Sequence, residues 1–370
     1  MPELPCVRAV PLRPLMRSLL QRLPRLPRLL RRAGTAGCLL AAACWAASAQ
    51  AGATLDAVRA RGQVVCGVGD DALLGLSAQA GDGRWEGLDV DICRAIAAAV
   101  LGDGEKVRYV PLSHTARFTA LQAGEVDVLS RSTTITLARD ASMGLHMTAV
   151  AFYDTQGFMV PARSRIRSAR QLKDKTVCVL QATTTVRNLA EYSRNNRLEL
   201  KTLAFDSLAD VNAAYFAGRC DAYSGDMSQL ASLRARLVAS PDMHVLLPEI
   251  IAKEPLGPMV RRGDTEWTTI VRWVVYGLIE AEELGVTRAN LEQLRASSQE
   301  PAVQRIVGTG EDLGRLLGLE RDWLARAIRA TGNYGEIFER NLGRGTPLAL
   351  PRGLNSLWNK GGLHFAPPLR

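Results

Sequence analysis

Short apolar runs alternate with amphipathic helical patterns along this chain, in two successive sets. The first set has strand-like runs at 63–68, 107–110 and 126–129, with helical patterns at 88–100 and 117–123. The second set has strand-like runs at 176–180, 200–205 and 221–223, with a helical pattern at 185–195. Strands that alternate with helices form parallel sheets covered by helices. The sequence therefore predicts an α/β protein with two mainly parallel sheets.

Two extended segments marked by Gly and Pro bracket the second set, at 156–161 and 256–260. This arrangement predicts one domain inserted into another and joined to it by two crossing strands, a joint that can hinge. We expect lobe 1 to comprise residues 54–157 plus 258–370, and lobe 2 to comprise 158–257.

The chain continues well beyond the second crossing segment. Helical patterns occupy 266–283 and 322–330, and a Gly-rich tail begins at Gly332. We expect this tail to be an ordered loop, because Trp358 and Phe365 need burial.

Positive charge is concentrated at the N-terminus. The formal net charge is +9, but the first 50 residues hold eight Arg, no Lys and one acid, whereas the other 320 residues hold 38 bases and 36 acids. The body of the protein is thus nearly neutral. We expect no nucleic-acid partner.

The first 51 residues have the layout of a secretory signal peptide. An Arg-rich stretch at 8–32 precedes a small apolar segment that ends in Ala47-Ser48-Ala49-Gln50-Ala51. We expect cleavage after Ala49 or Ala51 and export from the cytosol. The alternative is a basic amphipathic arm that binds nucleic acid or membrane.

Export permits disulfides, which persist outside the cytosol. Cys6, Cys38 and Cys44 lie in the segment to be removed, which leaves Cys66, Cys93, Cys178 and Cys220. Four cysteines allow three pairings. The local pairings, 66 with 93 and 178 with 220, would each stay within one half of the chain; the alternative is four buried free thiols.

Enzyme motifs are weak in this sequence. Residues 67–72 match the pattern G-x-G-x-x-A, but the glycines that follow break any helix, so a turn-rich loop is expected instead of a dinucleotide site. The histidines at 114, 146, 244 and 364 have no metal-ligand spacing. We expect no cofactor, no metal and no catalytic residue.

More specific is the segment Gly87-Leu88-Asp89-Val90-Asp91-Ile92, which opens a helical pattern. Taken alone, it is equally a capped helix with core positions. Its full pattern resembles the signature of the family-3 bacterial extracellular solute-binding proteins, the amino-acid receptors of ABC transporters. Segments at 117–122, 253–258 and 332–340 resemble the general or polar L-amino-acid-binding branch. The resemblance implies a two-lobed, type II periplasmic binding fold.

An amino acid presents one carboxylate and one ammonium, and each needs a partner when a cleft closes over it. Arg and backbone N–H groups suit the carboxylate; an acid and hydroxyls suit the ammonium. By resemblance, Arg139 binds the α-carboxylate, and Ser132 and Thr134 contribute hydroxyl or backbone contacts. The alternative is a solvated Ser/Thr loop with Arg139 in a surface ion pair.

In the second half, the resemblance assigns ligand contacts to residues that follow two strands. Thr184, with Thr183 beside it, offers backbone N–H groups to the carboxylate, and Asp226 binds the ammonium. Each is otherwise a plain helix cap. The family usually has Gly at the position of Ala182.

Ligand specificity is harder to read. By resemblance, Leu76 and His114 lie near the ligand side chain. Leu76 stands where the branch commonly has an aromatic residue, and Ile135 where relatives often have Trp.

The resemblance implies a monomeric periplasmic protein that captures free L-amino acids and delivers them to the permease subunits of an ABC transporter. The same fold also serves exported enzymes, such as cyclohexadienyl or arogenate dehydratases. Such an enzyme needs a general acid or base, for which Asp70, Asp71 and His114 are the candidates. A receptor module of a sensor is a third possibility.

Overall fold

The structure is a computed structural model that describes residues 52–70, 72–236 and 241–370. The predicted signal peptide at 1–51, its cleavage site and its three cysteines lie outside the described residues, as does Asp71.

The first sheet combines strands from both ends of the described chain. Its strand order is β4-β1-β5-β13-β6, formed by Val107–Leu112, Val64–Gly69, Val128–Leu129, Met259–Arg261 and Leu145–Met147, respectively. β1 is parallel to β4 and β5, whereas β13 runs antiparallel to β5 and β6.

The second sheet is built mainly from the predicted second set. Its order is β11-β7-β10-β8-β9, formed by His244–Leu246, Phe152–Pro161, Ala222–Asp226, Thr176–Leu180 and Lys201–Phe205, and β12 (Ala252–Leu256) also pairs with β7. β8 pairs in parallel with β9 and β10, whereas β7 pairs antiparallel with β10, β11 and β12. Both sheets are therefore mixed but mainly parallel in strand direction, as expected: β13 runs against the other strands of the first sheet, and β7 against those of the second.

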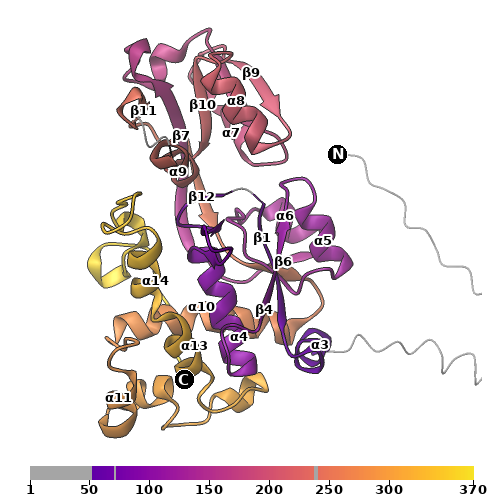
Figure 1. The fold of residues 1–370 in the computed structure, drawn as a ribbon, viewed down its shortest axis with the longest axis vertical. Coiled ribbons are helices and arrows are strands. Elements are labelled where there is room, and N and C mark those ends of the chain that lie inside the picture. Colours follow the sequence, from indigo (N-terminus) through magenta and orange to yellow (C-terminus); the bar gives the residue numbers. More distant parts are fainter. Residues whose placement is uncertain (1–51, 71, 237–240) are drawn as a thin grey trace, which may run out of the picture. The chain divides into compact units, whose positions relative to one another are not determined.

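Two strands cross between the sheets, as the sequence predicts (Figure 1). β7 and β12 pair antiparallel, from Phe152 opposite Leu256 to Gln156 opposite Ala252. The run expected at 256–260 is in fact two strands, β12 and β13, one in each sheet. Gly257 separates them, at a point where a Cβ atom would lie 2.0 Å from the carbonyl oxygen of Ala149.

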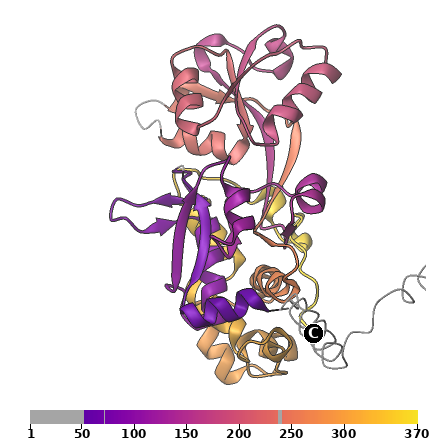
Figure 2. The same cartoon turned by 90° about the vertical axis from the view of Figure 1, so that its right-hand side faces the viewer.

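Helices flank both sheets (Figure 2). They include α3 (Ala53–Arg61), α4 (Leu88–Leu101), α5 (Arg117–Ala123), α6 (Leu137–Ser142), α7 (Thr185–Asn195), α8 (Leu208–Phe216), α9 (Met227–Arg236) and α10 (Thr265–Glu283). The fully buried Trp267 of α10 donates a hydrogen bond from its indole to the backbone oxygen of Asp127 beside β5, at 3.0 Å. In the part of the chain that the structure describes, no helix has the length and apolar character of a membrane span.

The C-terminal extension is more helical than expected. It contains α11 (Leu291–Ser297), α12 (Pro301–Val307), α13 (Trp323–Thr331) and α14 (Tyr334–Asn341). α14 lies where a loop was expected, and it begins with a capping box between Asn333 and Glu336. Trp358 and Phe365 are 49% and 60% exposed, so the expectation of their burial is wrong. They pack edge-to-face on each other instead.

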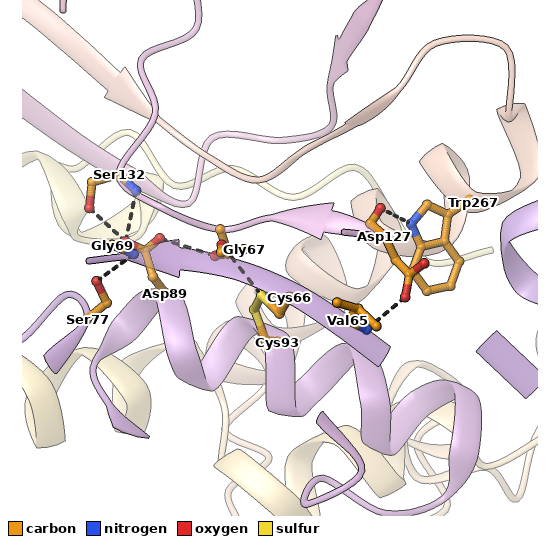
Figure 3. Close-up of a disulfide and its surroundings, with 11 residues drawn as sticks. Val65, Cys66, Gly67, Gly69, Ser77, Asp89, Cys93, Asp127, Ser132 and Trp267 are labelled. Carbon is orange, nitrogen blue, oxygen red and sulfur yellow. Dashed lines mark hydrogen bonds between the residues drawn. A yellow bond between two sulfur atoms is a disulfide. The ribbon is translucent and has the colours of Figure 1, made fainter. Parts of the chain in front are cut away.

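Both local disulfides are present. Cys66 of β1 pairs with Cys93 of α4 (Figure 3), and Cys178 of β8 pairs with Cys220, just before β10. Each bond joins elements of a single lobe. It therefore stabilises that lobe without linking the two.

Candidate ligand cleft

Seven of the eight predicted ligand residues line one cavity between the two lobes. Lobe 1 contributes His114, Arg117, Ser132, Thr134 and Arg139, and lobe 2 contributes Leu180, Thr183, Thr184, Thr185, Ser224, Gly225, Asp226 and Gln229. Most of these residues lie where strands end and helices begin, which is where parallel α/β sheets bind ligands. The eighth, Leu76, is buried in the core of lobe 1 at 1% exposure and does not line the cavity.

Asp89 holds the loop that carries Ser132 (Figure 3). Its carboxylate accepts hydrogen bonds from the Ser132 backbone N–H and hydroxyl, at 2.9 and 2.7 Å, and from the Ser130 hydroxyl at 3.2 Å. Burial raises the pKa of Asp89, whereas these hydrogen bonds lower it. Ser132 has a left-handed φ of 43°, so the loop is strained and Asp89 fixes it in place.

Arg139 reaches the cavity from the first turn of α6. The hydroxyl of Thr136 caps this helix and accepts the Arg139 backbone N–H at 3.2 Å. The guanidinium Nη1 donates to the carbonyl of Thr134 at 2.8 Å and lies over the Phe118 ring. Burial lowers the Arg139 pKa, opposed by Glu254 and Asp226. Because a guanidinium stays protonated even so, the cavity holds a buried cation.

The opposite wall is the turn from β8 into α7. The Thr183 hydroxyl donates to the carbonyl of Leu180 at 2.8 Å and accepts the backbone N–H of Thr185 at 3.2 Å. Thr184 is the N-cap residue, but its hydroxyl donates to Glu254 at 2.9 Å instead of capping the helix. Because Thr184 makes no side-chain cap, backbone N–H groups in the first turn of α7 other than that of Thr185 can meet an anion.

Asp226, the last residue of β10, supplies the negative charge of the cavity. Burial raises its pKa well above the ordinary value, and the nearby carboxylates of Asp154 and Glu254 raise it further. Arg139 and Arg117 act in the opposite direction. A cation that enters the cavity therefore stabilises the ionised form of Asp226.

Arg117 is a cavity residue that the sequence did not single out. It is 3% exposed, and its Nη2 donates to the carbonyl of Ala182 across the cleft at 3.0 Å. Its Nε is buried without a hydrogen-bond partner. Burial and the neighbouring Arg131 and Arg139 lower its pKa. In the sequence, Arg117 could have been identified by its position at the start of the 117–122 segment.

His114 lies beside a further cation, Arg131. Its Nδ1 lies 3.0 Å from Nη2 of Arg131. Burial and the nearby arginines lower the His114 pKa. The ring is thus neutral at physiological pH, and it offers hydrogen bonds but no charge.

Two lobes joined by crossing strands, with a charged cavity between them, define a periplasmic binding protein of type II. Comparison with known proteins identifies the group within this class. Residues 67–288 match the bacterial extracellular solute-binding proteins, family 3, and the chain belongs to that family.

Similar proteins cover most of the chain. The general L-amino acid-binding periplasmic protein AapJ of Rhizobium johnstonii is 51% identical over 88% of this chain and 95% of its own length. The glutamate/glutamine/aspartate/asparagine-binding protein BztA of Rhodobacter capsulatus is 48% identical over 90% and 97%. These relatives are binding proteins, so the exported-enzyme alternative has no support.

Among solved structures, a periplasmic binding protein of an ABC transporter from Brucella ovis with glutathione bound has a TM-score of 0.83. It is 48% identical, and the match covers 86% of this chain and 99% of that one. The C-terminal extension is therefore shared with this structure.

Proposed function

We propose that this protein captures free L-amino acids in the periplasm and delivers them to the permease of an ABC transporter. The observation that carries the proposal is the placement of the buried Arg139 and the partly buried Asp226, two opposite charges contributed by different lobes to one cavity. An amino acid carries the complementary pair of charges. The names of the relatives support the same ligand class.

In this proposal the α-carboxylate binds the Arg139 guanidinium and the backbone N–H groups at Thr184. The ammonium binds Asp226, assisted by oxygen atoms of Ser132 and Thr134. The Ser132 hydroxyl already donates to Asp89, so it meets the ammonium as an acceptor.

The ligand side chain is proposed to lie toward Arg117 and His114, with Thr183 beside it. The unpartnered Nε of Arg117 and the neutral imidazole favour a ligand with side-chain oxygen atoms. We therefore propose a preference for acidic and amide amino acids. Leu76, in the core, influences this region only through packing.

Binding requires the lobes, 54–157 plus 258–370 and 158–257, to move apart and close again. The free volume of the cavity is about 20 Å³, whereas a single water molecule needs roughly 10–15 Å³. An amino acid therefore needs a wider cleft, and its contacts to both lobes then favour closure. The closed monomer, exported and cleaved after Ala49 or Ala51, is proposed to dock on the permease.

Calorimetric titration with the twenty amino acids tests this function. The wild-type protein should bind acidic or amide amino acids, and chromatography should recover the ligand unchanged. Arg139→Ala should weaken binding about 100-fold or more, because it leaves a buried carboxylate without its partner. Arg187→Ala, at an exposed ion pair with Glu191 on α7, is the control. Equal affinities of the two variants would contradict the site assignment. Chemical conversion of the ligand would contradict the transport function.

A further inference from the structure

One face of the second sheet carries three carboxyl groups beside the cleft. Asp154 of β7 lies directly opposite Glu254 of β12, and Asp226 of β10 lies opposite Gln156 of β7. Alternate residues of a strand share a face, so Asp154 and Gln156 point to the same side. Asp154, Glu254 and Asp226, the hinge carboxyl cluster, are thus neighbours on one surface.

Glu254 and Asp154 are buried, Asp226 is partly buried, and the hydrogen-bonding capacity of the cluster is only partly satisfied. Glu254 is 1% exposed; its Oε1 accepts hydrogen bonds from Thr184 and Asn188 at 2.9 and 2.7 Å, but its Oε2 is buried without a partner. Asp154, 7% exposed, accepts hydrogen bonds from the Ser228 hydroxyl and from the backbone of Thr155 at 2.7 Å.

The cations that face the cluster both come from lobe 1. They are Arg139 of α6 and Arg117 of α5, while α7 and α9 contribute the uncharged Thr184, Asn188 and Ser228. Three carboxyl groups thus face two guanidinium groups. Like charges directly opposite each other on paired strands are destabilising. No three His, Cys, Asp or Glu side chains within the described ranges are arranged to hold a metal ion.

One proton on the cluster would balance the remaining negative charge. Burial raises the pKa of Asp154 to about 6, and burial together with Asp154 and Glu254 raises that of Asp226 well above its usual range. The cluster as a whole therefore retains a proton in mildly acidic solution without a ligand.

We infer that an amino acid entering the cleft expels this proton, so that ligand binding is coupled to proton release from the hinge carboxyl cluster. This inference rests on the proposed function. The ligand ammonium keeps its protons and pairs with the ionised Asp226, and the carboxyl proton passes to solvent. The positive charge of the ammonium beside Asp226 favours ionisation of that carboxyl group.

Calorimetry with L-glutamine, whose side chain does not titrate, tests the coupling. At pH 6, the binding enthalpy should differ between buffers of different ionisation enthalpy, in the sense of proton release. Because burial raises the pKa of Asp154 to about 6, the affinity should fall ~10-fold from pH 7 to pH 5. Binding without proton exchange, or with proton uptake, overturns the inference and leaves the proposed function standing. Absence of binding to any amino acid overturns the proposed function itself.

Glu254→Gln locates the proton. This variant keeps the acceptor for Thr184 and Asn188 and removes one charge, which lowers the pKa of the other two groups. Proton release at pH 6 should fall by more than half. Glu191→Gln, the same change at an exposed ion pair of lobe 2, should release protons as the wild type does. If Glu254→Gln releases as many protons as Glu191→Gln does, the assignment to this cluster is wrong. If Glu254→Gln does not fold, Asp154→Asn replaces it. The measurement on the wild-type protein does not depend on either variant.

Discussion

Ala182 is a strained residue at the edge of the cleft. Its φ of 55° is left-handed, a conformation that costs an L-residue about 1–2 kcal/mol, yet its carbonyl accepts the cross-lobe hydrogen bond from Arg117. Glycine adopts this conformation freely. Ala182 therefore stands where the family usually has Gly, at a position whose backbone conformation suits glycine.

Ala182→Gly should stabilise the unliganded protein by about 0.5–1 kcal/mol, because relief of strain exceeds the added entropy of the unfolded chain. Urea denaturation measures the change. Ala213→Gly, an exposed position inside α8, is the matched control and should destabilise by a similar amount. A loss of stability in both variants would show that the Ala182 backbone is unstrained.

The roles of some cleft residues can be assigned from the sequence, whereas the roles of others can be assigned only from the fold. Arg139 and Asp226 stand in local motifs, so resemblance placed them. Arg117 and Glu254 also stand in recognisable segments, but their roles depend on elements more than 60 residues away, at Ala182 and Asp154. Strand register creates those contacts, and no local pattern encodes it.

At the scale of elements, the C-terminal tail packs on the first crossing strand. The amide of Asn355 bonds to both backbone groups of Tyr153, at 2.7 and 3.0 Å, and the buried His364 ring lies against Tyr153 and Tyr334. The Nε2 of His364 is buried without a partner. The tail thus covers part of the edge of β7 where that strand leaves lobe 1.

His364 should make the stability of the protein sensitive to acid. Burial, with a smaller effect from Arg352, lowers its pKa to about 3, below the value of about 6.5 in the unfolded chain. The unfolded chain therefore binds the proton first, so stability is lost as pH falls below about 6.5. The loss from this group at pH 5 is about 2 kcal/mol.

His364→Phe keeps an aromatic ring and removes the titrating group. Chemical denaturation at pH 7 and pH 5 should show a loss of stability on acidification that is about 2 kcal/mol smaller in the variant than in the wild type. Parallel pH dependences of the two proteins would contradict this role.

Element prediction succeeded where tertiary contacts agreed with local pattern, as in α4 and α7. It failed at α14, where Gly332 and Gly335 argued for a loop. The Asn333–Glu336 capping box was the local signal for a helix there. Packing of the buried Phe338 on Phe152, 6.3 Å between ring centroids, then stabilises this short helix.

For the whole molecule, the hinge and the ligand loop are one connected structure. The backbone N–H of Ile135 donates to the carbonyl of Pro255 in β12 at 2.7 Å, and that of Gly257 donates to Thr133 at 3.2 Å. The loop that holds Ser132 and Thr134 is therefore tied to a crossing strand. The two bracketing segments in the sequence predicted the hinge, but not this tie.

Closure of the lobes should be visible in solution. Addition of the tightest-binding amino acid should reduce the radius of gyration measured by small-angle X-ray scattering, because the ligand contacts both lobes. Arg139→Ala should show no reduction at the same ligand concentration. An unchanged radius of the wild-type protein at saturation would argue against a hinged receptor.

The positions of the disulfides matter for the use of this protein as a dye-labelled fluorescent reporter of its ligand. All four cysteines of the described residues are paired, and each pair lies within one lobe. One new cysteine on each lobe would therefore accept fluorescent dyes without competition from these four. Because no covalent bond of either pair spans the hinge, the distance between the dyes would report the opening and closing of the cleft.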